Sequence, residues 1–241
     1  MNNIQPYSLF APIFAYPTEA YKTEVDNLQA FLNEHYPLAA KCFQPFSNYV
    51  ASTPSEQIEE VYTKTFHIQA VCYLDLGYVI FGEDYKRGEF LVNMKHEQDL
   101  AENDCGNDLA DNLVNVLTLL PKLKDQEFKE ELIVRILIPA LEKMLAEFKS
   151  SKMDLREKVL KKVQKVVIQQ GLPFGNIFQS ALSALLEVCK TAYSSTTLKA
   201  YTQVPEGYYG NFLSGCGISC STSSSDTSTT NTNTTSTIKT L

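Results

Sequence analysis

The 241-residue sequence predicts an all-α protein, folded as one bundle-like helical domain. Two observations lead to this fold class. Apolar residues recur with helical spacing in several segments, whereas no segment shows sustained alternation of apolar and polar residues with hairpin turns. The chain also has only 10 Gly and 10 Pro, so long stretches contain neither residue. Hydrophobic residues make up 44% of the chain, which is enough to form a buried core.

The first elements are two N-terminal segments, 6–15 and 18–35, separated at Tyr16-Pro17. The next helix is expected to start at a capping box in which Thr53 is the N-cap and Glu56 follows three residues later. An apolar stripe then continues the helix through Ile58, Val61, Tyr62 and Phe66.

A junction between two helices is expected around residues 78–91. The apolar run 78–81 ends at Gly82, which is placed to close one helix. Glu83 and Asp84 fit the first turn of the next helix, because the helix dipole favours acids there. Gly88 then falls inside that helix, where glycine costs about 1 kcal/mol relative to alanine. A neighbouring helix or a ligand backbone is therefore expected to lie close to Gly88.

Four further helices are predicted in the second half of the chain. The first contains Leu109, Leu113, Val116, Leu117 and Leu120 and stops at Pro121. A long helix from Phe128 to Phe148 is interrupted by Pro139, which should kink it. Another helix follows over 155–167, and a last one runs from Phe178 to Tyr193. The helical domain is assigned to residues 1–195.

The C-terminal part of the sequence differs from the rest in composition. From Ser221 to Thr237, 14 of 17 residues are Ser or Thr. Such a segment cannot bury enough apolar area to offset its chain entropy, so residues 221–241 are expected to form a disordered tail. Residues 196–220 are expected to be a loosely attached extension.

Charge and cysteine usage exclude several classes of protein. The formal net charge is −7, and no cluster of basic residues has the profile of a nucleic-acid-binding protein. No Lys or Arg precedes the short apolar run at the N-terminus, and no stretch reaches the ~20 apolar residues of a membrane span. We therefore expect a cytoplasmic protein with reduced thiols. Cys216 and Cys220 alone do not supply the four ligands of a structural zinc site.

The sequence lacks the common signatures of catalysis, such as G-x-G-x-x-G, H-E-x-x-H and G-x-S-x-G. The most enzyme-like feature is the pair Asp108 and Asp111, which is expected on one helix face. Such a pair either holds Mg²⁺ in a metal-dependent hydrolase or complements the helix dipole as part of an acidic surface. A further alternative is a helical scaffold or regulatory protein that docks partners through the six basic residues of 152–165.

Residues 61–91 resemble the central block of a known protein family. The block contains VYTKTF at 61–66, the apolar stretch CYLDLGYVIFGED at 72–84, and YKRGEFL at 85–91. In the NarJ/TorD family of molybdenum-cofactor assembly chaperones, also called nitrate reductase delta subunits, it reads Tyr-x-x-x-Phe, an apolar helix, then Gly-Glu-x-x-x-Arg-Gly. The matching residues here are Tyr62, Phe66, Gly82, Glu83, Arg87 and Gly88.

Weaker matches extend the resemblance over residues 8–195, in the family's order. IFAYP at 13–17 is similar to an early helix end of the family, and ILIPALEKML at 136–145 to its long helix with an internal proline. The family motif Glu-Leu-Pro-Asp-His-Leu-Pro corresponds to 108–114, where Asn112 replaces His. Asn112 can form hydrogen bonds but does not titrate near neutral pH, so no His-dependent step is carried over. The arrangement is most similar to the nitrate-reductase branch.

The resemblance implies a chaperone and not an enzyme. Such a protein binds the N-terminal region of a cytoplasmic molybdoenzyme catalytic (alpha) subunit, here one like nitrate reductase. It holds the apoprotein while bis-molybdopterin guanine dinucleotide is inserted, assists assembly of the complex, and then leaves. The expected state is a monomer or weak homodimer with no permanently bound cofactor and no metal.

A binding site for a client helix needs an apolar groove with polar ends. The wall is expected from Tyr62, Phe66, Tyr73, Leu74 and Tyr78, although core packing is the alternative for each. The residues expected to meet basic groups of the peptide are Asp84, Asp108 and Asp111. Arg87 either binds a client carboxylate or pairs with Glu83 one turn back. The resemblance also implicates the region of Asn112 in binding the client's leader peptide.

Overall fold

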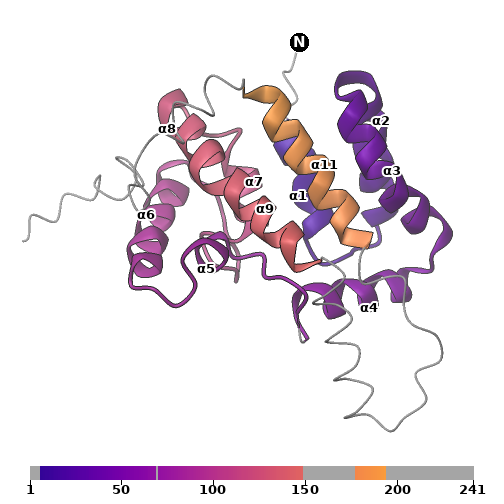
Figure 1. Ribbon diagram of the computed structural model, residues 1–241, viewed down its shortest axis with the longest axis horizontal. Helices are drawn as coiled ribbons and strands as arrows, with labels where there is room; N and C mark the ends of the chain where they lie inside the picture. Colours follow the sequence, from indigo (N-terminus) through magenta and orange to yellow (C-terminus); the bar gives the residue numbers. More distant parts are fainter. Residues whose placement is uncertain (1–5, 69, 149–176, 194–241) are drawn as a thin grey trace, which may run out of the picture.

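The structure, a computed structural model, describes residues 6–68, 70–148 and 177–193 (Figure 1). Within these ranges every regular element is a helix and no strand occurs, which confirms the all-α prediction. The elements are α1 (Pro6–Phe14), α2 (Tyr21–His35), α3 (Pro37–Ser52), α4 (Ser55–Phe66), α5 (Leu76–Phe81), α6 (Lys86–Leu100), α7 (Leu113–Leu119), α8 (Gln126–Glu131), the π-helix η1 (Leu132–Leu137), α9 (Ile138–Glu147) and α11 (Ile177–Ala192). The expected helix at 155–167, the basic stretch 152–165, the extension 196–220 and the tail 221–241 lie outside the described residues, as do Cys216 and Cys220.

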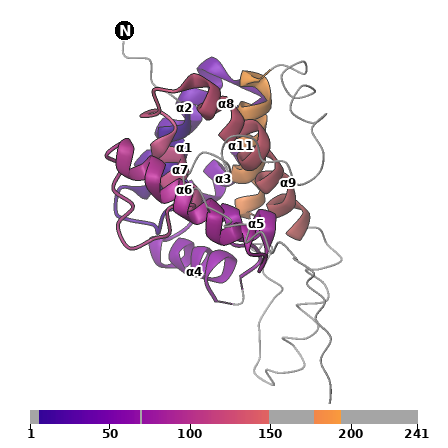
Figure 2. The ribbon, with the colours of Figure 1, turned by 90° about the vertical axis from the view of Figure 1, so that its left-hand side faces the viewer.

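The helices pack side by side around α1 and α11. α11 contacts α3 and α9, while α1 contacts α2 and α7. In Figure 1, α2 and α3 lie on one side of this pair, and α6, α7 and α8 lie on the other. α4 and α5 lie at the lower end of the molecule, a placement that Figure 2 shows from a second direction.

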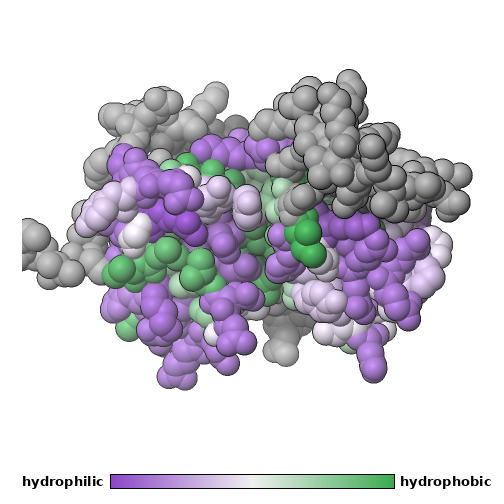
Figure 3. Space-filling model, turned by 90° about the horizontal axis from the view of Figure 1, so that it is seen from below, coloured by the Kyte–Doolittle hydropathy of each residue, from purple (hydrophilic) through white to green (hydrophobic). Residues whose placement is uncertain are grey.

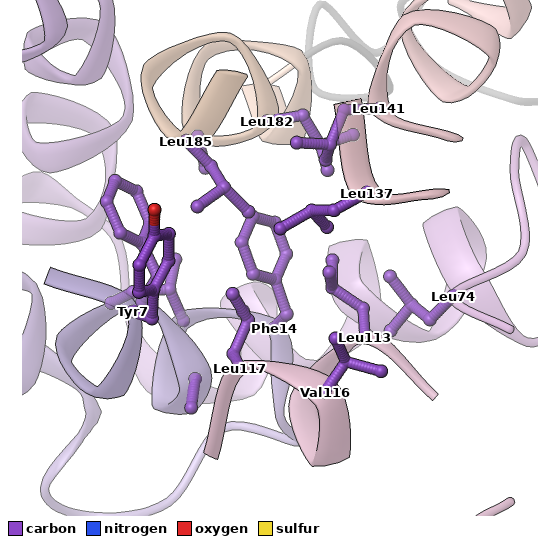
Figure 4. Packing of buried hydrophobic residues seen from close by; sticks show 14 of the residues in the cluster. Tyr7, Phe14, Leu74, Leu113, Val116, Leu117, Leu137, Leu141, Leu182 and Leu185 are labelled. Atoms are coloured by element: carbon purple, nitrogen blue, oxygen red, sulfur yellow. The ribbon is translucent and has the colours of Figure 1, made fainter. Parts of the chain in front are cut away.

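The core lies where these helices converge (Figure 4). Its side chains are almost fully buried and mostly aliphatic, with several aromatic rings between them. The residues labelled in the figure are Tyr7, Phe14, Leu74, Leu113, Val116, Leu117, Leu137, Leu141, Leu182 and Leu185. They come from α1, α7, η1, α9, α11 and the segment before α5, so the core joins both halves of the described chain.

The helix α3 was not expected from the sequence. It begins with Pro37 and contains Pro45, a residue that usually interrupts a helix. Its buried residues nevertheless follow helical spacing, and α3 packs closely against α11. Tertiary packing of this apolar face therefore outweighs the local cost of the proline.

The predicted capping box at the start of α4 is wrong. The Thr53 hydroxyl donates a 2.6 Å hydrogen bond to the carbonyl of Tyr49, so Thr53 belongs to the end of α3. α4 begins at Ser55, after Pro54, and no side chain caps its first turn. Because α3 and α4 are separated by only two residues, the hydroxyl bonds the preceding helix.

The long helix predicted across Pro139 is present as α8, the π-helix η1 and α9 in direct succession. The backbone stays helical at Leu137 and Ile138, and Pro139 lies in the first turn of α9, directly after the wider turns of η1. The expected kink at Pro139 stays a prediction.

Candidate functional site

A hollow of about 350 Å³ opens between the segment before α5, α5 itself and the end of α9. Val71, Cys72, Val79 and Met144 contribute apolar surface to it. The remaining lining residues are Tyr73, Tyr78, Lys143, Ala146 and Glu147. We call this hollow the α5–α9 groove. Figure 3 views the molecule from below, and hydrophobic residues reach this surface between hydrophilic ones, notably on the side where α5 and α6 lie.

Two tyrosines form the aromatic wall of the α5–α9 groove. The rings of Tyr73 and Tyr78 meet edge to face with their centroids 4.7 Å apart. Tyr73 is 48% exposed, which is unusual for a large aromatic side chain next to a core. The guanidinium of Arg87 lies over the ring of Tyr78, 5.1 Å from its centroid. This contact is a cation–π interaction, and it covers one face of the ring.

The short helix α5 is fixed at both ends. At its start, the Leu76 amide donates to the carbonyl of Asp111 at 3.0 Å, and the Leu113 amide donates to the carbonyl of Leu74 at 2.9 Å. At its end, the Lys143 ammonium on α9 donates a 2.9 Å hydrogen bond to the carbonyl of Ile80. The wall that carries Tyr78 is therefore positioned by a few polar contacts and not by a long helix.

Asp111 is the central residue of the first of these attachments. Its Oδ2 accepts a 2.8 Å hydrogen bond from the Gly77 amide, and its side chain is fully buried. Burial raises the pKa of its carboxyl from 3.8 to about 6, and the charge of Asp75 acts in the same direction. The Gly77 hydrogen bond and the charge of Arg87 oppose the rise.

Gly77 was missed in the sequence and proves essential for this contact. A Cβ atom at position 77 would lie 2.7 Å from Oδ2 of Asp111 and 2.9 Å from Cδ1 of Phe90. Real Cβ atoms do not approach other atoms so closely, so only glycine fits without a shift of its neighbours. The two residues are 34 positions apart in the sequence, and no local pattern signals their contact.

The predicted helix junction is correct at Gly82 and wrong beyond it. Gly82 closes α5 with a φ of 63°, a conformation that favours glycine. Glu83 and Asp84, however, precede α6, which starts at Lys86. The Asp84 side chain accepts a hydrogen bond from the Lys86 amide, so it acts at the helix entrance. Gly88 is exposed and no atom lies within 4 Å of where its Cβ would be, which contradicts the expected close approach.

Arg87 does not pair with Glu83, which was one of the alternatives for it. Arg87 is partly buried, and its described contact is with the ring of Tyr78. Its Nε atom is buried without a hydrogen-bond partner among the described residues. Arg87 thus lies next to a residue of the groove wall, and its binding of a client carboxylate stays a prediction.

Three of the five residues expected in the groove wall belong to the core. Tyr62 and Phe66 are only 4% and 5% exposed, and Leu74 is buried as well. The Tyr62 hydroxyl donates a 3.0 Å hydrogen bond to the carbonyl of Phe14. The ring of Phe66 packs against Phe178 with centroids 4.8 Å apart. For these three residues the alternative of core packing is correct, and only Tyr73 and Tyr78 line the groove.

The structure does not place Asp108 and Asp111 on one helix face. Both precede α7, which begins at Leu113, and Leu109 is 44% exposed instead of lying in the helix. Asp108 is exposed in the loop, whereas Asp111 is buried against Gly77. The prediction that Asp108 and Asp111 both meet basic groups of a peptide is therefore wrong, because the Asp111 side chain is buried. Among the described residues, no three His, Cys, Asp or Glu side chains come together as a metal-binding group.

Asn112 has a structural role in the same loop. Its Oδ1 accepts a 3.0 Å hydrogen bond from the Val114 amide and so caps α7. Its Nδ2 donates to Oδ1 of Asp75 at 3.3 Å. Asp75 and Asn112 also form an isolated antiparallel bridge. Asn112 thus joins the start of α7 to the start of α5.

A comparison of the chain with protein-family models gives no match, and no curated protein matches it either. Each helix that the structure describes is too short or too polar to span a bilayer.

Proposed function

We propose that the protein is a cytoplasmic chaperone of the NarJ/TorD type. It binds the N-terminal region of a molybdoenzyme catalytic subunit, similar to that of nitrate reductase. It assists the insertion of bis-molybdopterin guanine dinucleotide and the assembly of the enzyme complex, and it catalyses no reaction itself. The resemblance of residues 61–91 and the order of the weaker motifs support this proposal.

The α5–α9 groove is the observation that carries the proposal. It has the composition of a site for an amphipathic helix, because apolar and aromatic residues line it together with the charged residues Lys143 and Glu147. Its volume of about 350 Å³ is at the lower end of the range of roughly 300–1,000 Å³ for ligand pockets. We infer that it holds one or two anchoring side chains of the client, while the rest of the client helix lies across the surface.

The charges of the molecule favour a basic client segment. The chain has a formal net charge of −7, and a negative field attracts basic peptides and steers their association. Glu147 lies in the groove lining itself. Lys143 is directed to the carbonyl of Ile80, where it offsets the negative end of α5. The net negative charge of the chain therefore favours a client segment in which basic residues stand next to an apolar anchor.

The test measures binding of a synthetic peptide with the N-terminal sequence of a molybdoenzyme catalytic subunit. The variants Tyr73→Ala and Tyr78→Ala each remove part of the aromatic wall, and we expect the affinity to fall about tenfold or more. Tyr85→Ala is the matched control, because Tyr85 is an 83% exposed tyrosine next to the start of α6 and does not line the groove. Unchanged binding in both groove variants, or equal binding of a client lacking its first residues, would contradict the proposal.

A further inference from the structure

Two buried polar atoms next to the α5–α9 groove have no hydrogen-bond partner among the described residues. One is Oδ1 of Asp111, the carboxylate oxygen that does not contact Gly77. The other is Nε of Arg87, the donor at the base of the guanidinium that covers Tyr78. One atom is an acceptor and the other is a donor, so they are chemically complementary. Buried polar groups rarely stay unpaired, because each loses its hydration without compensation.

The charge of Arg87 already acts on Asp111. Within the described part of the chain, the charged groups that influence the Asp111 carboxyl are Asp75, before α5, and Arg87, on α6. Asp75 disfavours ionisation and Arg87 favours it, while α5 contributes the amide of Gly77. Phe90 of α6 lies close to Gly77, the residue that bonds the carboxyl. Among the residues that the structure describes, Arg87 is thus the cation whose charge favours the ionised carboxylate.

We propose that Arg87 has two positions, and that an ionised Asp111 draws its guanidinium off the ring of Tyr78 and so uncovers that ring in the groove wall. The described arrangement, with Arg87 on Tyr78, is the form that suits a neutral Asp111. In the second form a charge-assisted hydrogen bond joins Arg87 to Asp111 and satisfies both unpaired atoms. The identity of the ligand that then contacts the uncovered ring of Tyr78 rests on the proposed function, whereas the movement of Arg87 does not.

The local structure permits this movement. Arg87 is in the first turn of α6 and follows the turn at Gly82, whose φ of 63° marks the break between the two helices. Its neighbours Lys86 and Gly88 are exposed, so a change in the Arg87 rotamer meets little packing on that side. The ring of Tyr78 keeps its edge-to-face contact with Tyr73 when the guanidinium leaves.

The direction of the pH dependence follows from the burial of Asp111. Burial raises the pKa of this carboxyl to about 6, so the covered form predominates below that pH and the uncovered form above it. At the slightly alkaline pH typical of cytoplasm, the face of the Tyr78 ring that Arg87 covers is then also available to a ligand. Pairing with Arg87 lowers the pKa of the Asp111 carboxyl, so ionisation of the carboxyl shifts the ratio of the two forms towards the paired one.

The first experiment follows the tyrosine ring signals of the full chain by NMR from pH 5 to pH 8. We expect the Tyr78 ring signals to shift with a midpoint near the pKa of about 6 of the Asp111 carboxyl. The isosteric Asp111→Asn variant should abolish the shift. Asp108→Asn, in the same loop but exposed, should leave it unchanged.

A second variant keeps the test independent of the folding of Asp111→Asn. Arg87→Met removes the charge and retains an apolar side chain beside Tyr78, so the Tyr78 shift should disappear. The carboxyl carbon of Asp111 should then titrate at a higher pH, because the favourable charge of Arg87 is gone. Tyr78 signals that stay constant between pH 5 and pH 8, or that move equally in Asp111→Asn, would overturn the proposal.

Peptide binding separates this inference from the proposed function. Affinity for the client peptide should rise between pH 5 and pH 7.5 in the unmodified chain and stay constant in Asp111→Asn. If no peptide binds at any pH while the Tyr78 signals still shift, the proposed chaperone function is contradicted and the movement of Arg87 is supported. If the peptide binds while the Tyr78 signals do not shift, the movement of Arg87 is contradicted and the chaperone function is supported.

Discussion

The amide nitrogen of Gly77 lies 2.8 Å from Oδ2 of Asp111, and the same oxygen would lie 2.7 Å from a Cβ atom at position 77. The contact between Gly77 and Asp111 thus requires both the amide of Gly77 as donor and the absence of a side chain at position 77. It attaches the start of α5 to the loop before α7. The position of the groove wall depends on this attachment, since Tyr78 is the next residue in the chain.

We predict that Gly77→Ala destabilises the fold by about 1–3 kcal/mol, because the added methyl group forces a shift of Asp111 or Phe90. Urea unfolding measures the change. Gly88→Ala is the matched control, since nothing lies within 4 Å of its Cβ position and it is exposed in α6. Replacement of that helical glycine should raise stability by roughly 0.5–1 kcal/mol. Equal effects of the two substitutions would contradict the assigned contact.

The stability of the protein should depend on the ionisation of Asp111. Its pKa in the folded chain is about 6 instead of 3.8, so the folded state favours the neutral carboxyl. The contribution is fully present below about pH 4 and is lost as the pH rises through 6, with an upper limit of roughly 3 kcal/mol. Pairing of the ionised Asp111 carboxylate with Arg87 restores part of the lost stability.

The measurement for Asp111 compares urea midpoints at pH 4.5 and pH 7.5. At each pH, the urea midpoint of the unmodified chain is subtracted from that of Asp111→Asn. This difference should be larger at pH 7.5 than at pH 4.5. Asp108→Asn tests whether any carboxylate of the loop has the same effect, and we expect no such change. A constant difference between Asp111→Asn and the unmodified chain would show that the carboxyl does not titrate in this range.

Phe66 and Tyr73 should respond to truncation in opposite ways. Phe66→Ala removes a ring that packs on Phe178 in the core, so it should cost about 3–5 kcal/mol of stability. Tyr73→Ala removes a half-exposed ring at the groove, so stability should change by less than about 1 kcal/mol while client binding weakens. Thermal unfolding and peptide titration of both variants give the comparison. Strong destabilisation by Tyr73→Ala would place that ring in the core.

The hydroxyl of Tyr62 should contribute measurably to the stability of the α1–α4 contact. Tyr62→Phe leaves the carbonyl of Phe14 without its buried donor, and we expect a loss of roughly 1–3 kcal/mol. Tyr16→Phe removes a hydrogen bond to Glu59 on the surface and should cost less than about 0.5 kcal/mol. Denaturant unfolding of the two variants under one condition decides between them. Similar losses would indicate that water replaces the buried bond.

The sequence allowed the helices with long apolar stripes to be predicted, because their periodicity does not depend on distant residues. α4 and α11 follow their predicted ranges closely. α3 was missed because Pro45 signals an interruption that packing against α11 overrides. The helix expected over Asp108 and Asp111 starts later, since Asn112 caps it at Leu113.

The candidate site was harder to predict than the fold. Tyr62, Tyr73 and Tyr78 are all tyrosines with similar apolar neighbours in the sequence. Only the three-dimensional packing separates the buried Tyr62 from the two residues at the groove. Gly77 likewise gave no local signal, because its partner Asp111 is 34 residues away. The residues that fix the groove are thus defined by contacts between distant segments.

The π-helix η1 has a consequence for any shorter version of this chain. A π turn closes with i→i+5 hydrogen bonds and so holds about one residue more than an α turn. Deletion of one residue within 132–137 would therefore let this segment close as an ordinary α-helix, with Lys143 and Met144 still facing the groove. A deletion of one residue within α8 or at the start of α9 has no such extra residue to remove, and it would turn the residues that follow by about 100° and take Lys143 away from the carbonyl of Ile80. The long helix thus tolerates a change of length in one segment, none of whose side chains line the groove.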